Sequence, residues 1–128
     1  MDAFRVLIVD DEDDFRETII KRLHNRKIAA DEASGGRRAL EKLAAEKFDI
    51  VVLDVKMPDM DGIDVLKEIK LRFPLVEVIM LTGHASVESG IQGMQLGAFD
   101  YVMKPVPLDE LLDKMRQAYE RRLLRQQG

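Results

Sequence analysis

Short apolar runs alternate with amphipathic helical patterns along the whole chain. The runs are rich in valine and isoleucine, which is typical of strands that are buried in a sheet. Between the runs, apolar residues recur at roughly every third or fourth position, as they do on the buried face of a helix. Repeated strand-then-helix units predict an α/β fold whose parallel sheet is covered by helices on both faces. The predicted strands span residues 6–9, 28–30, 50–53, 78–81 and 101–103.

Glycine and proline punctuate the helical patterns. The Gly35–Gly36 pair precedes the second predicted helix, and the turn-rich segment 57–62 precedes the third, which Pro74 ends. No internal linker, repeat or low-complexity stretch interrupts the alternation. The apolar positions that define the helices are Phe15, Ile19 and Leu23; Ala39, Leu40 and Leu43; Val65, Leu66, Ile69 and Phe73; Val87, Ile91 and Met94; and Leu108, Leu111, Leu112, Met115, Tyr119 and Leu123.

Polar side chains follow four of the five predicted strands. They are Asp10 and Asp11 after the first strand, Asp54 after the third, Thr82 after the fourth and Lys104 after the fifth. The second strand ends near Asp31 and Glu32, which is less informative. In a parallel sheet, functional groups gather beyond the carboxyl ends of the strands. We therefore expect these side chains to meet at one edge of the sheet.

The acidic members of this set predict a cation site, because clustered carboxylates repel one another. Asp10, Asp11 and Asp54 carry a formal charge of −3, which a divalent cation and Lys104 together bring to zero. Hard oxygen ligands of this kind suit Mg²⁺. Without a metal, we expect like-charge repulsion to raise the pKa of at least one of the carboxyl groups.

Asp54 is also a candidate nucleophile, because carboxylates form aspartyl-phosphates. Phosphoryl transfer depends mainly on positioning and charge neutralisation, which Mg²⁺ and Lys104 would supply. The Thr82 hydroxyl and the Gly83 backbone N–H can donate hydrogen bonds to phosphoryl oxygens, and Gly83 leaves space for the approach. Phosphorylation replaces one negative charge by about two, so we expect the new oxygens to pull on Thr82 and Lys104.

Composition and charge narrow the function classes. The chain has 128 residues, enough for one domain with its own core. Its net charge of −4 argues against a nucleic-acid surface, and no apolar run approaches the roughly 18 residues that cross a bilayer. Because it lacks cysteine, disulfides and thiolate metal sites are excluded, and we expect a cytoplasmic protein.

Charge is concentrated near the two ends of the chain. We expect Asp13 or Asp14 to cap the first helix, because acidic residues are stabilising in the first turn. We expect Arg121, Arg122 and Arg125 to lie on the exposed end of the last helix.

Four motifs carry a family resemblance. They are VLIVDDE with Asp10 and Asp11, VVLDVKMPDMDG with Asp54, MLTGHAS with Thr82, and YVMKPV with Lys104 and Pro105. In this order, each at the end of a predicted strand, they resemble the receiver domain of two-component response regulators over nearly the whole chain. The resemblance implies one receiver domain over residues 1–128, with a flavodoxin-like, doubly wound (βα)5 fold and the strand order 2-1-3-4-5. Residues 80–106 most resemble receivers of the nitrogen-regulator type.

The resemblance also implies a role for each site residue. Asp11 and Asp54 would ligate Mg²⁺ directly, Asp10 would do so largely through water, and the backbone carbonyl of Lys56 would complete the protein ligands. Asp54 would be the phosphoacceptor, and Lys104 would pair with its phosphoryl group. The peptide bond that follows Lys104 is often cis in such domains.

Two further roles follow from the same resemblance. Tyr101 occupies the position of a switch aromatic, which swings inward as Thr82 moves towards the phosphate. Lys56 and His84 occupy positions that tune dephosphorylation.

The implied partners are a sensor histidine kinase or a phosphotransfer protein, with no direct nucleic-acid or membrane binding by this domain. Residues 120–128 are interpreted as the start of a linker to an output domain, and the process that the receiver controls is expected to be transcription. Dimerisation through the fourth helix, fifth strand and fifth helix is left open. The domain is expected to self-phosphorylate and slowly dephosphorylate, without being an enzyme in the metabolic sense.

Three alternatives are weighed against this interpretation. A phosphohydrolase of the haloacid-dehalogenase type needs a second acid two residues after its nucleophile, where this chain has Lys56. A receiver that has lost phosphorylation conflicts with the intact set of acids together with Thr82 and Lys104. Nucleotide or flavin binding lacks support, because no glycine-rich phosphate loop follows the first strand.

The fourth predicted helix should be marginally stable, because Gly90 and Gly93 lie inside it and each costs about 1 kcal/mol relative to alanine. We expect it to move most on activation. In a hydrogen-exchange experiment, the amides of residues 86–96 should be among the least protected helical ones. Protection equal to that of the third helix would contradict this prediction.

Overall fold

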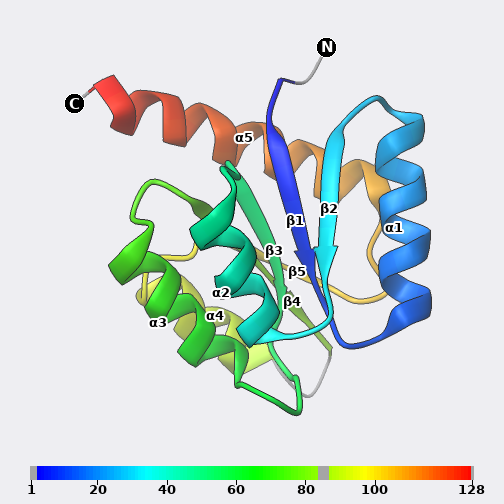
Figure 1. Cartoon of the computed structure of the whole chain (residues 1–128), viewed down its shortest axis with the longest axis horizontal. Helices are drawn as coiled ribbons and strands as arrows, with labels where there is room; N and C mark the ends of the chain where they lie inside the picture. The colour runs from blue at the N-terminus through cyan, green and yellow to red at the C-terminus, as the bar shows by residue number, and fades with distance from the viewer. Residues whose placement is uncertain (1–2, 84–86, 128) are drawn as a thin grey trace.

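Strand and helix alternate along the chain, as the sequence predicts (Figure 1). The computed structural model describes residues 3–83 and 87–127. The strands are β1 (Arg5–Val9), β2 (Ala29–Ala33), β3 (Ile50–Asp54), β4 (Glu77–Thr82) and β5 (Asp100–Met103). The helices are α1 (Asp13–Asn25), α2 (Gly36–Ala45), α3 (Gly62–Arg72), α4 (Val87–Gln95) and α5 (Leu108–Gln127). Within the described ranges, no helix is both long and apolar enough to cross a bilayer.

The strands form one parallel sheet in the order β2-β1-β3-β4-β5, which confirms the predicted topology. In its register, Asp54 lies opposite Leu81, and Thr82 lies opposite Met103. All strands of a parallel sheet end on the same side, which we call the carboxyl edge. The ends of β1, β3, β4 and β5 are therefore neighbours there.

Two hydrophobic cores hold the sheet between helices, because successive strand residues point to opposite faces. In β3, Ile50 and Val52 belong to the core under α1 and α5, whereas Val51 and Leu53 belong to the core under α2 and α3. Figure 1 shows α1 and α5 on one face and α2, α3 and α4 on the other. The central strands are thus fixed from both sides, and only their ends are free to carry polar groups.

The edge strand β2 differs from the prediction. The strand ends at Ala33, near the predicted end, but it extends beyond the predicted run 28–30 and includes Asp31 and Glu32. Their side chains point to opposite faces, and each meets a base from the helix on its own face. The Lys42 ammonium of α2 lies 2.9 Å from Asp31, and the Arg16 guanidinium of α1 lies 2.9 Å from Glu32. These long-range partners make two acids tolerable in a half-buried strand.

The start of α1 also differs from the prediction. Glu12 is the N-cap, with extended backbone and no capping bond from its side chain. Asp13 and Asp14 lie in the first turn, where their charges interact favourably with the helix dipole, but they do not cap the helix. Instead, the Asp10 carboxylate accepts a hydrogen bond from the Glu12 N–H at 2.9 Å, so the site's own acid shapes the turn into the helix.

The end of α5 is not simply exposed, contrary to the expectation for its arginines. Arg121 donates two hydrogen bonds of 2.6 Å to the Glu77 carboxylate, which is fully buried at the start of β4. Arg125 adds a contact of 3.2 Å to the same carboxylate, and Arg122 donates to Asp49 at 2.9 Å. These ion pairs tie α5 to the sheet at the end opposite the carboxyl edge.

The start of α3 lies directly against the end of β3. Asp61 caps the helix by accepting a hydrogen bond from the Ile63 N–H at 2.9 Å, and the Gly62 N–H donates to the Val55 carbonyl at 2.9 Å. A Cβ atom at Gly62 would lie 2.5 Å from the backbone oxygen of Asp54. Glycine is required here because two backbone segments approach more closely than any side chain allows.

Gly62→Ala should therefore destabilise the fold by about 1–3 kcal/mol, because the backbone at Asp54 must shift to admit the methyl group. Denaturant unfolding measures this difference. Gly83→Ala is the matched control, because a Cβ at Gly83 meets no heavy atom of the described residues within 4 Å. Equal stability of the two variants would contradict the packing described for Gly62.

Candidate functional site

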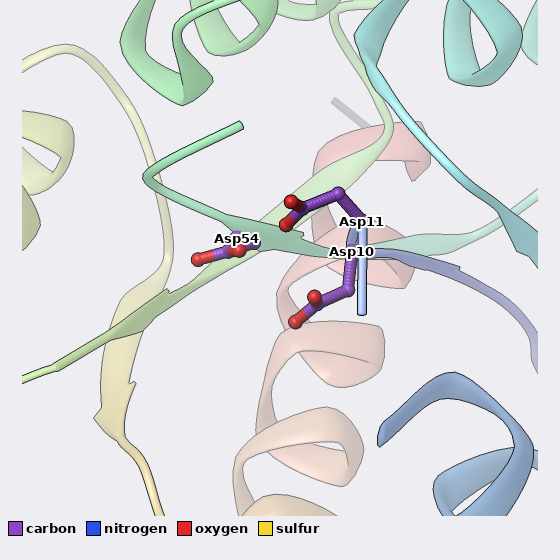
Figure 2. Close-up of side chains that lie close together, drawn as sticks. All are labelled: Asp10, Asp11 and Asp54. Carbon is purple, nitrogen blue, oxygen red and sulfur yellow. The ribbon is translucent and has the colours of Figure 1, made fainter. Parts of the chain in front are cut away.

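Three carboxylates meet at the carboxyl edge (Figure 2). Asp10 and Asp11 follow β1, and Asp54 ends the adjacent strand β3. Each offers an oxygen that lies within 4.8 Å of the other two. Asp10 and Asp54 are buried, whereas Asp11 is exposed, so the group opens to solvent on the side of Asp11. The predicted meeting of these residues is confirmed.

Lys104 reaches the same carboxylates from the end of β5. Its ammonium lies 2.7 Å from the Asp10 carboxylate and 3.7 Å from that of Asp54. It also contacts the Glu12 carboxylate at 3.0 Å and lies over the Phe15 ring. Lys104 is thus shared among several acids, and its closest partner is Asp10 rather than Asp54. Burial alone would lower the pKa of Lys104, but the bonds to Asp10 and Glu12 outweigh it and raise that pKa.

Thr82 brings a hydroxyl to the site from the end of β4. The residue is 1% exposed, and its Oγ1 has no hydrogen-bond partner among the described residues. Such a group is costly to bury unless it gains an acceptor. Its carbonyl accepts a hydrogen bond from the Lys104 N–H at 2.7 Å, which joins the ends of β4 and β5. None of the described residues fills the space that a Cβ at Gly83 would occupy, as expected.

Two further predicted site residues, Tyr101 and Lys56, are among the described residues. Tyr101 is half-buried in β5, and the Lys56 N–H donates to the Asp54 carboxylate at 3.3 Å while its side chain is exposed. The Lys104–Pro105 bond is cis, as the resemblance implies. His84 lies outside the described residues.

Sequence reasoning missed Arg16, which is buried beneath the acidic loop. Its guanidinium donates to the Asp10 carbonyl at 2.7 Å, to Asp13 at 2.6 Å and to Glu32 at 2.9 Å. A base placed behind the acids both fixes the loop and offsets part of its charge. The signal was weak, because an arginine in a helical pattern is ordinarily solvent-exposed.

The electrostatic cost of the group falls mainly on Asp54. Burial and the nearby charge of Asp10 raise the pKa of Asp54 to about 6, with a smaller contribution from Asp11. Lys104 and the Lys56 N–H act in the opposite direction without cancelling the rise. The predicted upward shift of a carboxyl pKa is thus borne out, and its largest cause is burial.

These residues fit a divalent cation. The donor set is three carboxylates, a hard oxygen set of the kind that Mg²⁺ and Ca²⁺ take, and it retains excess negative charge after Lys104 is counted. One carboxylate is exposed, which leaves an open side for water or a further ligand.

Comparison with known proteins gives the family. A model of the response regulator receiver domain matches residues 6–116. The chain belongs to this family. The regulatory protein AtoC of Escherichia coli K12 is 42% identical over 107 residues, which are 84% of this chain and 23% of AtoC. The DNA-binding transcriptional regulator NtrC of the same strain is 34% identical over 113 residues, 88% of this chain and 24% of NtrC.

Solved structures agree with this assignment. The receiver domain of the Francisella response regulator 1452 superposes with a TM-score of 0.84 at 31% identity, covering 92% of this chain and 98% of that one. As a response regulator receiver domain similar to nitrogen regulators, the chain is a component of two-component signalling, and transcription regulators are among its relatives. It spans about a quarter of the length of AtoC and NtrC.

Asp54→Asn should change the pH dependence of stability in metal-free buffer. In the unfolded chain Asp54 ionises near the ordinary aspartate pKa, whereas in the folded receiver its pKa is about 6. The folded state of wild type is therefore destabilised as the pH rises from the lower pKa to the higher one. Relative to wild type, the free energy of unfolding of the variant should rise by about 2 kcal/mol as the pH is raised from 4.5 to 7.5. Denaturant unfolding with chelator present measures this difference.

Asp59→Asn is the matched control for this experiment. Asp59 lies in the same loop, but hydrogen bonds from the Arg37 and Gly36 N–H groups outweigh burial and lower its pKa. Its substitution should therefore produce no such gain. A gain of equal size in both variants would contradict the electrostatic origin of the effect at Asp54.

Proposed function

We propose that this receiver domain is a phosphorylation-dependent switch in which Asp54 accepts a phosphoryl group with the help of Mg²⁺. The observation that carries the proposal is the position of the Asp54 carboxylate, which lies within 4.8 Å of the carboxylate oxygens of Asp10 and Asp11 and 3.7 Å from the Lys104 ammonium. A nucleophile in contact with both a cation-binding set and a fixed cation is suited to phosphoryl transfer.

The residues that would hold Mg²⁺ are Asp10, Asp11 and Asp54, with the backbone carbonyl of Lys56. When bound, the ion supplies positive charge that neutralises phosphoryl oxygens. In this assignment the donor approaches from the side of Asp11, because Asp11 is exposed whereas Asp10 and Asp54 are buried.

The transfer itself is a substitution at phosphorus. A carboxylate oxygen of Asp54 forms the new O–P bond as the bond between phosphorus and the donor's leaving group breaks, and the leaving group departs with the electron pair. Lys104 pairs with the transferred group, while the Thr82 hydroxyl and the Gly83 N–H donate to its oxygens. The Thr82 hydroxyl supports this role, since it has no hydrogen-bond partner among the described residues and a phosphoryl oxygen would satisfy it.

The proposed output is a rearrangement of Thr82 and Tyr101 that alters the face formed by α4, β5 and α5. This face would control an output domain or a partner, including a second copy of the chain, and the regulated process would be transcription. The donor would be a sensor histidine kinase or a phosphotransfer protein in the cytoplasm. Lys56 and His84 would tune the rate at which the phosphate is lost.

The proposed domain covers residues 1–128, with 120–128 as the start of a linker. Two observations bear on this boundary. The helix α5 continues to Gln127, and its arginines at 121, 122 and 125 contact the sheet, so a linker would leave the domain along a helix that is already fixed.

Acetyl phosphate labelling tests the proposed function. With Mg²⁺, the wild-type chain should gain one acid-stable, base-labile phosphate and slowly lose it, whereas Asp54→Asn should gain none and metal-free wild type should gain far less. Asp59→Asn is the control from the same loop and should label normally. Equal labelling of Asp54→Asn would refute the assignment of the phosphoacceptor.

A further inference from the structure

Helix α4 contacts the sheet through its glycines. Gly90 and Gly93 are its buried residues, whereas Ile91 and Met94 are 46% and 43% exposed. The helix packs on β4 and β5, the strands that carry Thr82 and Tyr101. Glycines on the buried face let the helix backbone itself touch the side chains below.

The two glycines touch different neighbours. A Cβ atom at Gly90 would lie 3.0 Å from the Thr82 Cγ2 methyl, and 3.0 and 3.2 Å from the Cγ and Cβ atoms of Tyr101. A Cβ at Gly93 would lie 3.0 Å from Met80 Cγ and 3.6 Å from a methyl of Leu66. Gly90 alone of this pair contacts both residues of the proposed switch.

We propose that Gly90 is a positioning residue that couples Tyr101 to Thr82, by leaving between them the space through which the switch operates. This inference rests on the proposed function and specifies how the site is regulated. Thr82 and Tyr101 lie on neighbouring strands and meet the same point of the α4 backbone. A displacement of the Thr82 side chain towards Asp54 frees volume at this point, and the Tyr101 ring can follow only if that volume stays empty.

A methyl group at position 90 would fill this space permanently. The ring carbon of Tyr101 and the Thr82 methyl are both attached close to the backbone, so neither can yield as a long flexible side chain does. The atoms nearest to a Cβ at Gly90 belong to Thr82 and Tyr101, and the contact with Thr82 is to its methyl group rather than its hydroxyl, so we expect Asp54 still to accept a phosphoryl group. Gly90→Ala should therefore separate phosphorylation from the response of Tyr101.

Gly93→Ala is a matched control. It places the same methyl on the same helix, with the same gain of roughly 1 kcal/mol in helix propensity. Its closest neighbour is the Met80 Cγ atom at 3.0 Å, so the added methyl crowds a residue outside the proposed switch by the same distance. Any effect of helix stability alone should appear in both variants, and an effect of the switch contact should appear only in Gly90→Ala.

The experiment uses ¹⁹F NMR of the chain labelled with 3-fluorotyrosine, before and after treatment with Mg²⁺ and acetyl phosphate. The chain has two tyrosines. Tyr119 packs beside the Phe4 ring in the core on the opposite face and serves as an internal reference. Phosphate incorporation is measured on the same samples.

We expect wild type and Gly93→Ala to incorporate phosphate and to shift the Tyr101 resonance. Gly90→Ala should incorporate phosphate but lose the Tyr101 shift. A full shift in Gly90→Ala, or loss of the shift in both alanine variants, would overturn the inference while leaving the phosphoacceptor assignment intact. Absence of labelling in wild type would instead refute the proposed function.

Thr82→Ser tests the same contact from the other side and does not require Gly90→Ala to fold. It removes the Cγ2 methyl that faces Gly90 while keeping the hydroxyl. Among molecules that have incorporated phosphate, we expect a reduced Tyr101 shift, because less volume is freed beside the ring. An unreduced shift would count against coupling through this contact.

Discussion

Repulsion among three carboxylates is the constraint on which the rest of the structure depends. Asp10, Asp11 and Asp54 would separate if they were free, but the parallel pairing of β1 with β3 holds them together at the carboxyl edge. Part of the unfavourable energy falls on Asp54, whose pKa is raised first by burial and then by the nearby charge of Asp10. The hydrophobic effect on both faces of the sheet provides the free energy that keeps the strands in place despite this repulsion.

The surrounding residues limit that repulsion without removing it. Lys104 approaches from one side and Arg16 from beneath, yet neither makes a hydrogen bond to the Asp54 carboxylate. The site therefore keeps an affinity for added positive charge. The opposite end of the sheet is different, because buried Glu77 is fully matched by Arg121 and its neighbours. The buried acid at one end of the domain is thus paired with bases, whereas the acids at the other end keep a net negative charge that a ligand can offset.

The fold and the acidic site could be predicted because they depend on local patterns. Apolar runs with β-branched residues mark the strands, and in a parallel sheet the residues after them must meet. The errors arose where a distant partner decides the outcome. Asp31 and Glu32 remain in a strand because Lys42 and Arg16 pair with them, and the arginines of α5 are fixed by acids far away in the sequence. No local sequence pattern predicts such pairs.

The glycines of α4 also show what the sequence alone could not predict. The sequence predicts that Gly90 and Gly93 weaken a helix, whereas the structure also shows a specific neighbour for each of them. Their cost to helix propensity and their value in close packing cannot be separated without coordinates.

The central claim is tested most directly by ¹³C NMR titration of the Asp54 carboxyl group, first with chelator and then with Mg²⁺. The account predicts a pKa of about 6 without metal and a marked fall when Mg²⁺ is added. An ordinary aspartate pKa without metal, unchanged by Mg²⁺, would contradict it.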